Sequence, residues 1–85
     1  MLGELSERDR AILTLEAAWP RHGGMKEETI RAQLGMSPAR YYQLLGRLID
    51  TAEAQEHDPM LVKRLRRLRD ARTAARVSRA AGQTR

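Results

Sequence analysis

The sequence predicts an all-α protein: a three-helix helix-turn-helix core followed by a long basic C-terminal helix. Apolar residues recur at three- and four-residue spacing in several segments, and cap residues and prolines mark where those segments begin. No segment alternates apolar and polar residues as a strand would. A chain of 85 residues supplies one small domain, which is too little for a two-domain enzyme.

The first predicted helix begins after Ser6, a cap hydroxyl with the Asp9 carboxylate three residues on. Pro20 ends this helix, and the pair at 23–24 is a glycine break that lets the chain turn. Its expected apolar face consists of Ala11, Ile12, Leu15, Ala18 and Trp19.

A second short helix starts at Lys26 and places Ile30 and Leu34 on one face. Gly35 is expected to close it in the left-handed conformation, and Ser37 to cap a third helix whose first residue is Pro38. The third helix has the strongest period in the chain, carried by Tyr41, Leu44, Leu45, Leu48 and Ile49.

Gly46 costs stability inside this third helix, so either close packing or close approach to a ligand would explain it. Residues 50–57 are predicted as an acidic connector that keeps some helical turns. Asp58 and Pro59 then start the fourth helix, which docks through Leu61, Leu65 and Leu68. Beyond residue 70 the helix is expected to project or to fray near residue 82, with a disordered end.

Composition and charge narrow the class of protein. Leu, Ile, Val and Phe together supply only sixteen of 85 residues, so each large apolar side chain is expected to be buried in a thin core. Without cysteine there is no disulfide framework and no thiolate metal site. Neither a signal pattern nor an apolar run of membrane-spanning length occurs, which predicts a cytoplasmic protein without membrane contact.

The charge divides the chain into residues 1–59, the core with its acidic connector, and residues 60–85, the basic helix and frayed tail. The first part holds seven basic and ten acidic side chains, and the second nine basic and one acidic. A solvated helix normally mixes both signs, so this excess indicates a polyanionic partner. A basic solubilising tail is the alternative.

The short helix, the link at residues 35–37 and the third helix together predict a helix-turn-helix. Residues 30–48 resemble the promoter-reading helix-turn-helix of bacterial sigma factors. Arg31 stands where that motif usually has a small alanine, a departure that would loosen the crossing of its two helices.

Three blocks occur in the same order as in a known family: residues 5–13 (LSERDRAIL), 35–37 (GMS) with 40–45 (RYYQLL), and 57–65 (HDPMLVKRL). The chain is similar there to an uncharacterised family of small proteins from high-GC Gram-positive bacteria and their phages. The resemblance covers residues 5–72 and implies a helix-turn-helix and a bacterial source, but no chemistry.

The predicted site is a DNA-binding surface in two parts. The residues expected to read bases lie on the third helix: Pro38, Ala39, Arg40, Tyr42, Gln43 and Arg47. Among them, Arg40, Gln43 and Arg47 are of types that can address guanine, adenine and phosphate respectively. The residues expected to bind phosphate are Ser37, Lys63, Arg64, Arg66, Arg67, Arg69, Arg72 and Arg76. Ordinary solvated helix surfaces and a helix cap at Ser37 are the alternatives.

No other chemistry is indicated. His22 and His57 lie 35 positions apart without neighbouring ligands, so no metal site is expected. Glu27 and Glu28 are adjacent and point about 100° apart on a helix, which is unsuited to paired acid/base work. We therefore expect neither an enzyme nor a cofactor nor a small-molecule substrate.

The predicted function is binding of double-stranded DNA in the nucleoid, as a transcriptional regulator or an architectural protein. A second hypothesis is a protein-interaction module, in which Leu61, Leu65, Leu68 and Ala75 form a seam for a homodimer or for RNA polymerase, with Arg72 interrupting it. A third is RNA binding through the arginine-rich helix, which the few aromatic residues make weaker.

Overall fold

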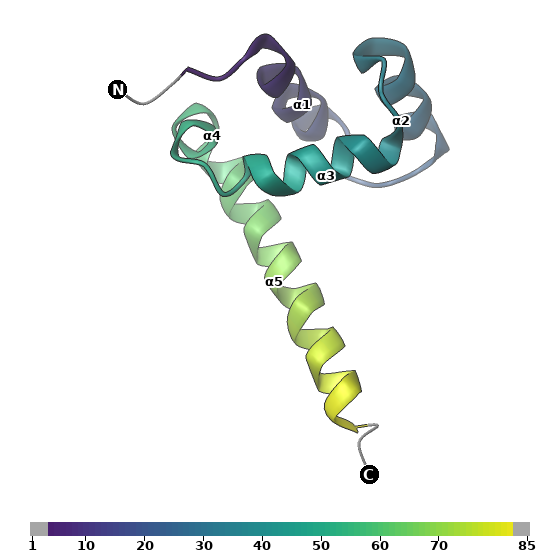
Figure 1. Cartoon of the computed structure of the whole chain (residues 1–85), viewed down its shortest axis with the longest axis vertical. Helices are drawn as coiled ribbons and strands as arrows, with labels where there is room; N and C mark the ends of the chain where they lie inside the picture. The colour runs from purple at the N-terminus through teal and green to yellow at the C-terminus, as the bar shows by residue number, and fades with distance from the viewer. Residues whose placement is uncertain (1–3, 83–85) are drawn as a thin grey trace.

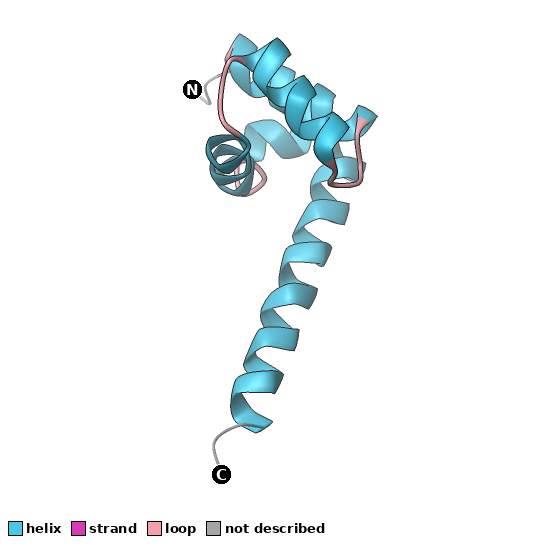
Figure 2. Ribbon diagram, turned by 90° about the vertical axis from the view of Figure 1, so that its right-hand side faces the viewer, coloured by secondary structure: helices cyan, strands magenta, loops and turns pink. Residues whose placement is uncertain are grey.

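The computed structural model describes residues 4–82, and every regular element in that range is helical (Figures 1 and 2). The elements in chain order are α1 (Glu7–Ala18), α2 (Gly24–Thr29), the π-helical turn η1 (Ile30–Leu34), α3 (Pro38–Leu48), α4 (Ala52–His57) and α5 (Pro59–Gly82). The all-α prediction is confirmed.

Helix α1 begins where the sequence predicts. The Asp9 amide donates to the Ser6 hydroxyl at 3.0 Å, and the helix ends before Pro20. The buried face differs from the expected one, because Leu13 and Glu16 are buried with Ile12 and Leu15 whereas Ala18 is exposed. The apolar stripe alone did not indicate that a carboxylate would enter the core.

The helix-turn-helix forms from α2 with η1, a short link and α3. Gly35 has a φ of 63°, the left-handed conformation that glycine adopts without strain, and its amide bonds back to the Arg31 carbonyl. Ser37 caps α3 by accepting from the Arg40 amide at 3.1 Å. Ile30 is fully buried and Arg31 is exposed, so the arginine does not enter the crossing of the two helices.

The segment predicted as a connector is a short helix of its own. The Thr51 hydroxyl caps α4 by accepting from the Ala54 amide at 3.1 Å, and Ala54 is completely buried. Asp58 then caps α5 by accepting from the Leu61 amide at 3.2 Å. Because α4 packs on α5, the polar segment positions the start of the last helix.

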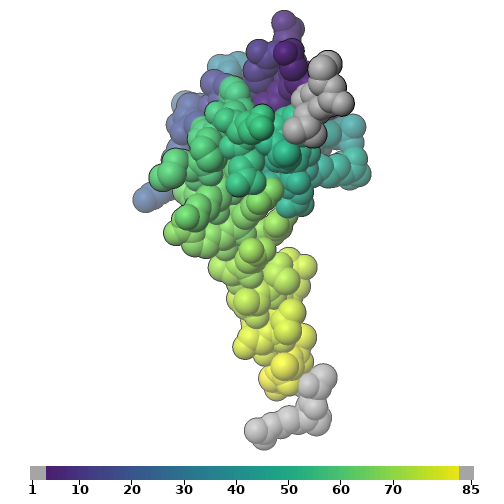
Figure 3. Space-filling view, turned by 90° about the vertical axis from the view of Figure 1, so that its left-hand side faces the viewer, coloured from purple at the N-terminus to yellow at the C-terminus, as the bar shows by residue number. Residues whose placement is uncertain are grey.

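Helix α5 contains 24 residues, and only its first turns lie in the body of the protein. Leu61 and Val62 are buried, Leu65 is partly buried, and Leu68 is 47% exposed. Every residue from 70 to 82 is exposed, and Figure 3 shows this part as a narrow stem that leaves the body. The predicted projection is thus observed, whereas the expected disorder at the end lies outside the described residues.

The core consists of buried residues from α1, η1, α3, α4 and α5, with Tyr41 and Ile12 at its centre. Four of the five predicted apolar residues of α3 are buried, and Leu44 is partly buried. The expectation that every large apolar side chain is buried was wrong for Met25, Met60, Leu68 and Val77. For Val77 the reason is that the core does not extend to the distal half of α5.

Candidate nucleic-acid interface

The polar flank of α3 faces solvent. Ala39, Arg40, Gln43 and Arg47 are exposed, and Pro38 and Tyr42 are partly buried. The Arg40 guanidinium donates to the Gln43 amide oxygen at 3.1 Å, so the two side chains lie together on the surface. The structure therefore places Arg40 beside Gln43 and leaves Arg47 exposed on the same helix, whereas Tyr42 is partly buried.

The opposite flank of α3 determines which way this surface points. Tyr41, Leu45 and Leu48 are buried, so rotation of α3 about its axis would expose the core. Tyr41 also fixes the orientation of α3 against α1, because its hydroxyl lies 2.7 Å from a Glu16 carboxylate oxygen and 3.3 Å from the Ile12 carbonyl. Burial, and then the hydrogen bond to Glu16, raise the pKa of the Tyr41 hydroxyl.

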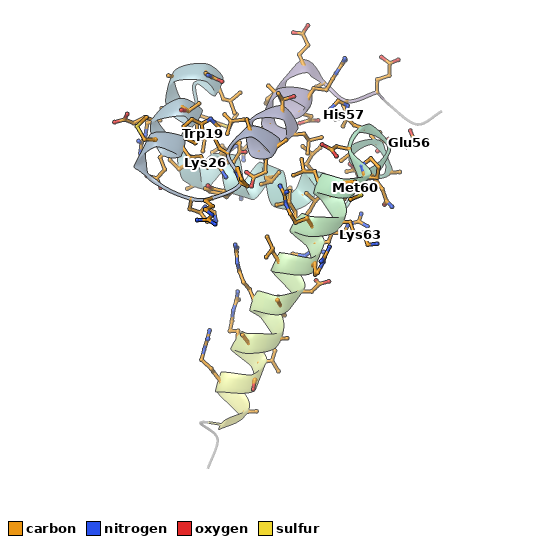
Figure 4. The ribbon with its side chains drawn as sticks, turned by 180° about the vertical axis from the view of Figure 1, so that it is seen from behind. Trp19, Lys26, Glu56, His57, Met60 and Lys63 are labelled. Atoms are coloured by element: carbon orange, nitrogen blue, oxygen red, sulfur yellow. The ribbon has the colours of Figure 1, made fainter. Side chains whose placement is uncertain are left out.

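A buried ion pair also lies where α1, α2 and α3 meet. Lys26 on α2 donates to Glu16 on α1 at 2.8 Å, and the two residues are 1% and 3% exposed. The Lys26 ammonium also lies 5.8 Å from the Tyr41 ring centre and 5.2 Å from that of Tyr42. Figure 4 shows Lys26 directed into the space between α1, α2 and α3.

Sequence reasoning missed this pair. Glu16 stands four residues after Ile12 and three after Leu13, which places it on the buried side of α1, and that position was the available signal. Nothing local indicated Lys26 as its partner. Tyr42, predicted to read bases, is partly buried and shares a 2.7 Å hydrogen bond with His22 Nδ1.

Two of the predicted phosphate ligands hold α5 to the end of α3. The Arg66 Nε donates to the Ile49 carbonyl at 2.7 Å, and Arg69 donates to both carboxylate oxygens of Asp50 at 3.0 and 2.9 Å. A helix C-terminus leaves carbonyl groups free and favours nearby cations. The hydrogen bond to Asp50 is the main cause that raises the pKa of Arg69.

The remaining predicted phosphate ligands on α5 are exposed. Within residues 4–82 no carboxylate lies within ion-pair distance of these five side chains: Lys63, Arg64, Arg67, Arg72 and Arg76. Arg79 is likewise exposed, with no carboxylate of the described residues at ion-pair distance. Ser37 is exposed at the start of α3, where its oxygen serves as the helix cap.

These cations lie on different sides of α5. Arg72, Arg76 and Arg79 are spaced by four and three, so they form one row. That row continues the side of α5 that faces α3, because Arg72 lines a cleft between the two helices, whereas Lys63 and Arg67 line a separate hollow on another side. Figure 4 shows nitrogen-tipped side chains projecting from the distal part of α5 toward the side of α2.

Half of the predicted self-association seam is occupied inside the protein. Leu61 is 4% exposed and belongs to the core, and Leu65 packs against that core. Of the four predicted seam residues, Leu68 and Ala75 remain exposed. Two exposed apolar positions separated by Arg72 are too few for the heptad repeats of a coiled coil.

The fold and this surface define a small all-α helix-turn-helix protein with a projecting basic helix. Residues 4–77 match the family described as "Protein of unknown function (DUF3263)", and the chain belongs to that family. No curated protein and no solved structure matches the chain.

Residues 4–82 lack two other kinds of feature. No helix there combines the length and apolar character needed to cross a bilayer. The same residues contain no group of three or more His, Cys, Asp or Glu side chains arranged to hold a metal ion.

Proposed function

We propose that this protein binds double-stranded DNA, with α3 in the major groove and the row of arginines on α5 against phosphates. The observation that supports this most is the exposed flank of Arg40, Gln43 and Arg47 on a helix whose opposite flank is buried. Such a helix presents polar groups in a constant orientation, as recognition helices do.

The chemistry of the flank suits base edges. Arginine donates two hydrogen bonds to guanine, and glutamine pairs with adenine, each contact discriminating by about 1–3 kcal/mol. The hydrogen bond between Arg40 and Gln43 is exposed to water, so exchanging it for bonds to bases costs little.

Helix α5 would supply affinity that does not depend on sequence. Arg72, Arg76 and Arg79 are exposed and have no carboxylate neighbour within the described residues. In this proposal they contact phosphates beside the groove that α3 occupies. Arg66 and Arg69 would contribute less, because Ile49 and Asp50 already bind their guanidinium groups.

The salt dependence of binding tests the proposal. If about six cations displace counterions, the logarithm of affinity falls against the logarithm of salt concentration with a slope of roughly −5. Fluorescence anisotropy with a labelled duplex at several salt concentrations measures that slope. A nearly flat line would exclude phosphate-driven binding.

Selection from randomised duplexes with the purified protein then separates a regulator from an architectural protein. A consensus that disappears in an Arg40→Ala/Gln43→Ala variant supports base reading by α3. An Arg72→Gln/Arg76→Gln variant should weaken binding to all sequences alike. Recovery of no preference would favour the architectural role, and preference for structured RNA over the duplex at equal salt would contradict the proposal.

A further inference from the structure

A cleft of about 220 Å³ lies between α3 and α5, with the end of α1 at one side. Its apolar wall consists of Leu45 from α3, Ile49 directly after that helix, and Leu65 and Leu68 from α5. The contacts of Arg66 and Arg69 with the end of α3 hold its two long walls together. The cleft is thus built by the docking of α5.

Glycine creates part of this space. Gly46 lines the cleft, and a Cβ atom added to it would meet nothing within 4 Å beyond its chain neighbours and the adjoining backbone of α3. Close helix packing, one of the two explanations offered by the sequence, therefore does not account for Gly46. Absence of a side chain there leaves the middle of the α3 wall open.

The charged groups around the cleft are unbalanced. Glu16 faces it but is paired with Lys26, and Arg69 is paired with Asp50. Arg64 and Arg72 also line it, and both are exposed and have no carboxylate partner in the described part of the chain. An occupant with an apolar body and a single negative charge would match both features.

We propose that this cleft binds a small amphipathic carboxylate, with its apolar chain against Leu45, Leu65 and Leu68 and its carboxylate beside Arg64 and Arg72. The volume is below the range of roughly 300–1,000 Å³ usual for drug-sized ligands, which favours a ligand on the order of ten non-hydrogen atoms. The inference does not rest on DNA binding, and its test contains no nucleic acid.

The test is a titration followed by ¹H–¹⁵N correlation spectra, with octanoate as the probe. Octanol and octylammonium have the same chain with no charge or the opposite charge. Octanoate should shift the amide signals of Gly46 and Leu68 and bind most tightly of the three. Hexanoate should bind about tenfold more weakly, because it buries two fewer methylene groups.

Substitution of Gly46 supplies matched variants. Gly46→Leu should place a side chain in the cleft and weaken octanoate binding by at least about tenfold, as expected when an apolar pocket is filled. Gly46→Ala should leave most of the cleft open, and it should raise the melting temperature because alanine favours helix. Circular dichroism of both variants shows whether they fold.

A separate prediction concerns Arg64 and Arg72, the two arginines at the edge of the cleft that have no carboxylate partner within residues 4–82. Arg64→Gln and Arg72→Gln should each weaken octanoate binding about threefold, in keeping with an exposed charge pair, and leave octanol unaffected. Equal affinity for the three eight-carbon probes, or unchanged binding by a folded Gly46→Leu variant, would overturn the proposal. It would also fail if the cleft signals move with protein concentration alone, since a second copy of the chain would then cover the site.

Discussion

Lys26 and Glu16 show how single residues specify the junction of α1, α2 and α3. Both are buried, and each is satisfied by the other, with Tyr41 donating a further hydrogen bond to Glu16. Within residues 4–82 no buried side-chain nitrogen or oxygen lacks a partner. A buried pair adds little net stability by itself, but an unpaired buried charge is costly, which disfavours other arrangements of these helices.

Replacing one partner of the ion pair should therefore lower the free energy of unfolding more than replacing both partners. Lys26→Met leaves the Glu16 carboxylate buried without its cation and should lower the free energy of unfolding by about 3–5 kcal/mol. A Glu16→Gln/Lys26→Met variant keeps an acceptor for Tyr41 and should recover part of that loss. Urea denaturation of the three proteins checks the order, and a double variant no more stable than Lys26→Met would refute the explanation.

Because of Tyr41, the free energy of unfolding should depend on pH in the alkaline range. Because burial raises its pKa in the folded state, the stabilisation is complete below the unfolded pKa of about 10 and decreases as the pH rises above it. Tyr41→Phe should destabilise the protein at pH 8 by about 1–3 kcal/mol, since Glu16 loses a donor. That difference should shrink between pH 10 and 12 in chemical denaturation, and a difference independent of pH would contradict it.

At the scale of elements, α5 is attached to the C-terminal end of α3 by cations. Arg66 binds the Ile49 carbonyl, and Arg69 binds Asp50, whose side chain is 56% exposed. Exposed ion pairs of this kind contribute about 0–1 kcal/mol, so burial of Leu61 and Val62 does most of the anchoring.

Replacing Asp50 should accordingly change the affinity for DNA more than the stability of the fold. Asp50→Asn removes the carboxylate that neutralises Arg69, so duplex binding at low salt should tighten about threefold while stability changes by less than about 1 kcal/mol. Glu56→Gln, which removes an exposed charge on α4, is the matched control. Equal effects of the two variants would mean that only net charge matters.

The starts of three helices followed closely from the sequence, because caps act over three residues. Ser6, Ser37 and Asp58 each accept an amide three positions ahead, as their sequence context predicts. The connector at residues 50–57 was less well predicted, because its helix depends on Ala54 being packed into the core. Such burial is a tertiary effect that a polar sequence does not reveal.

At the scale of the whole molecule, a helical body carries a stem that contacts almost nothing else. The extents are 49, 35 and 18 Å, and the stem accounts for much of the long dimension (Figure 1). A helix this exposed and this rich in arginine gains little from the core. Its stability in isolation is low, and a polyanion that neutralises the row of Arg72, Arg76 and Arg79 would favour it.

Removing residues 74–85 tests the division between body and stem. Because residues 74–82 are exposed, the shortened chain should keep its fold and nearly its melting temperature. It lacks Arg76, Arg79 and Arg85, so the salt slope of duplex binding should become less steep by about 2–3. Circular dichroism and anisotropy measure these quantities, and an unchanged slope would show that these arginines do not contact phosphate.

The sequence by itself determined where the three helices capped by Ser6, Ser37 and Asp58 begin, which flank of α3 is buried, and that the positive charge gathers in the last third of the chain. These features depend on neighbours within a few residues. Only the tertiary structure decided that Lys26 pairs with Glu16, that Arg66 and Arg69 bind the end of α3, and that Gly46 opens a cleft. The reason is that each of these depends on how two helices cross, which brings together groups that no local spacing relates.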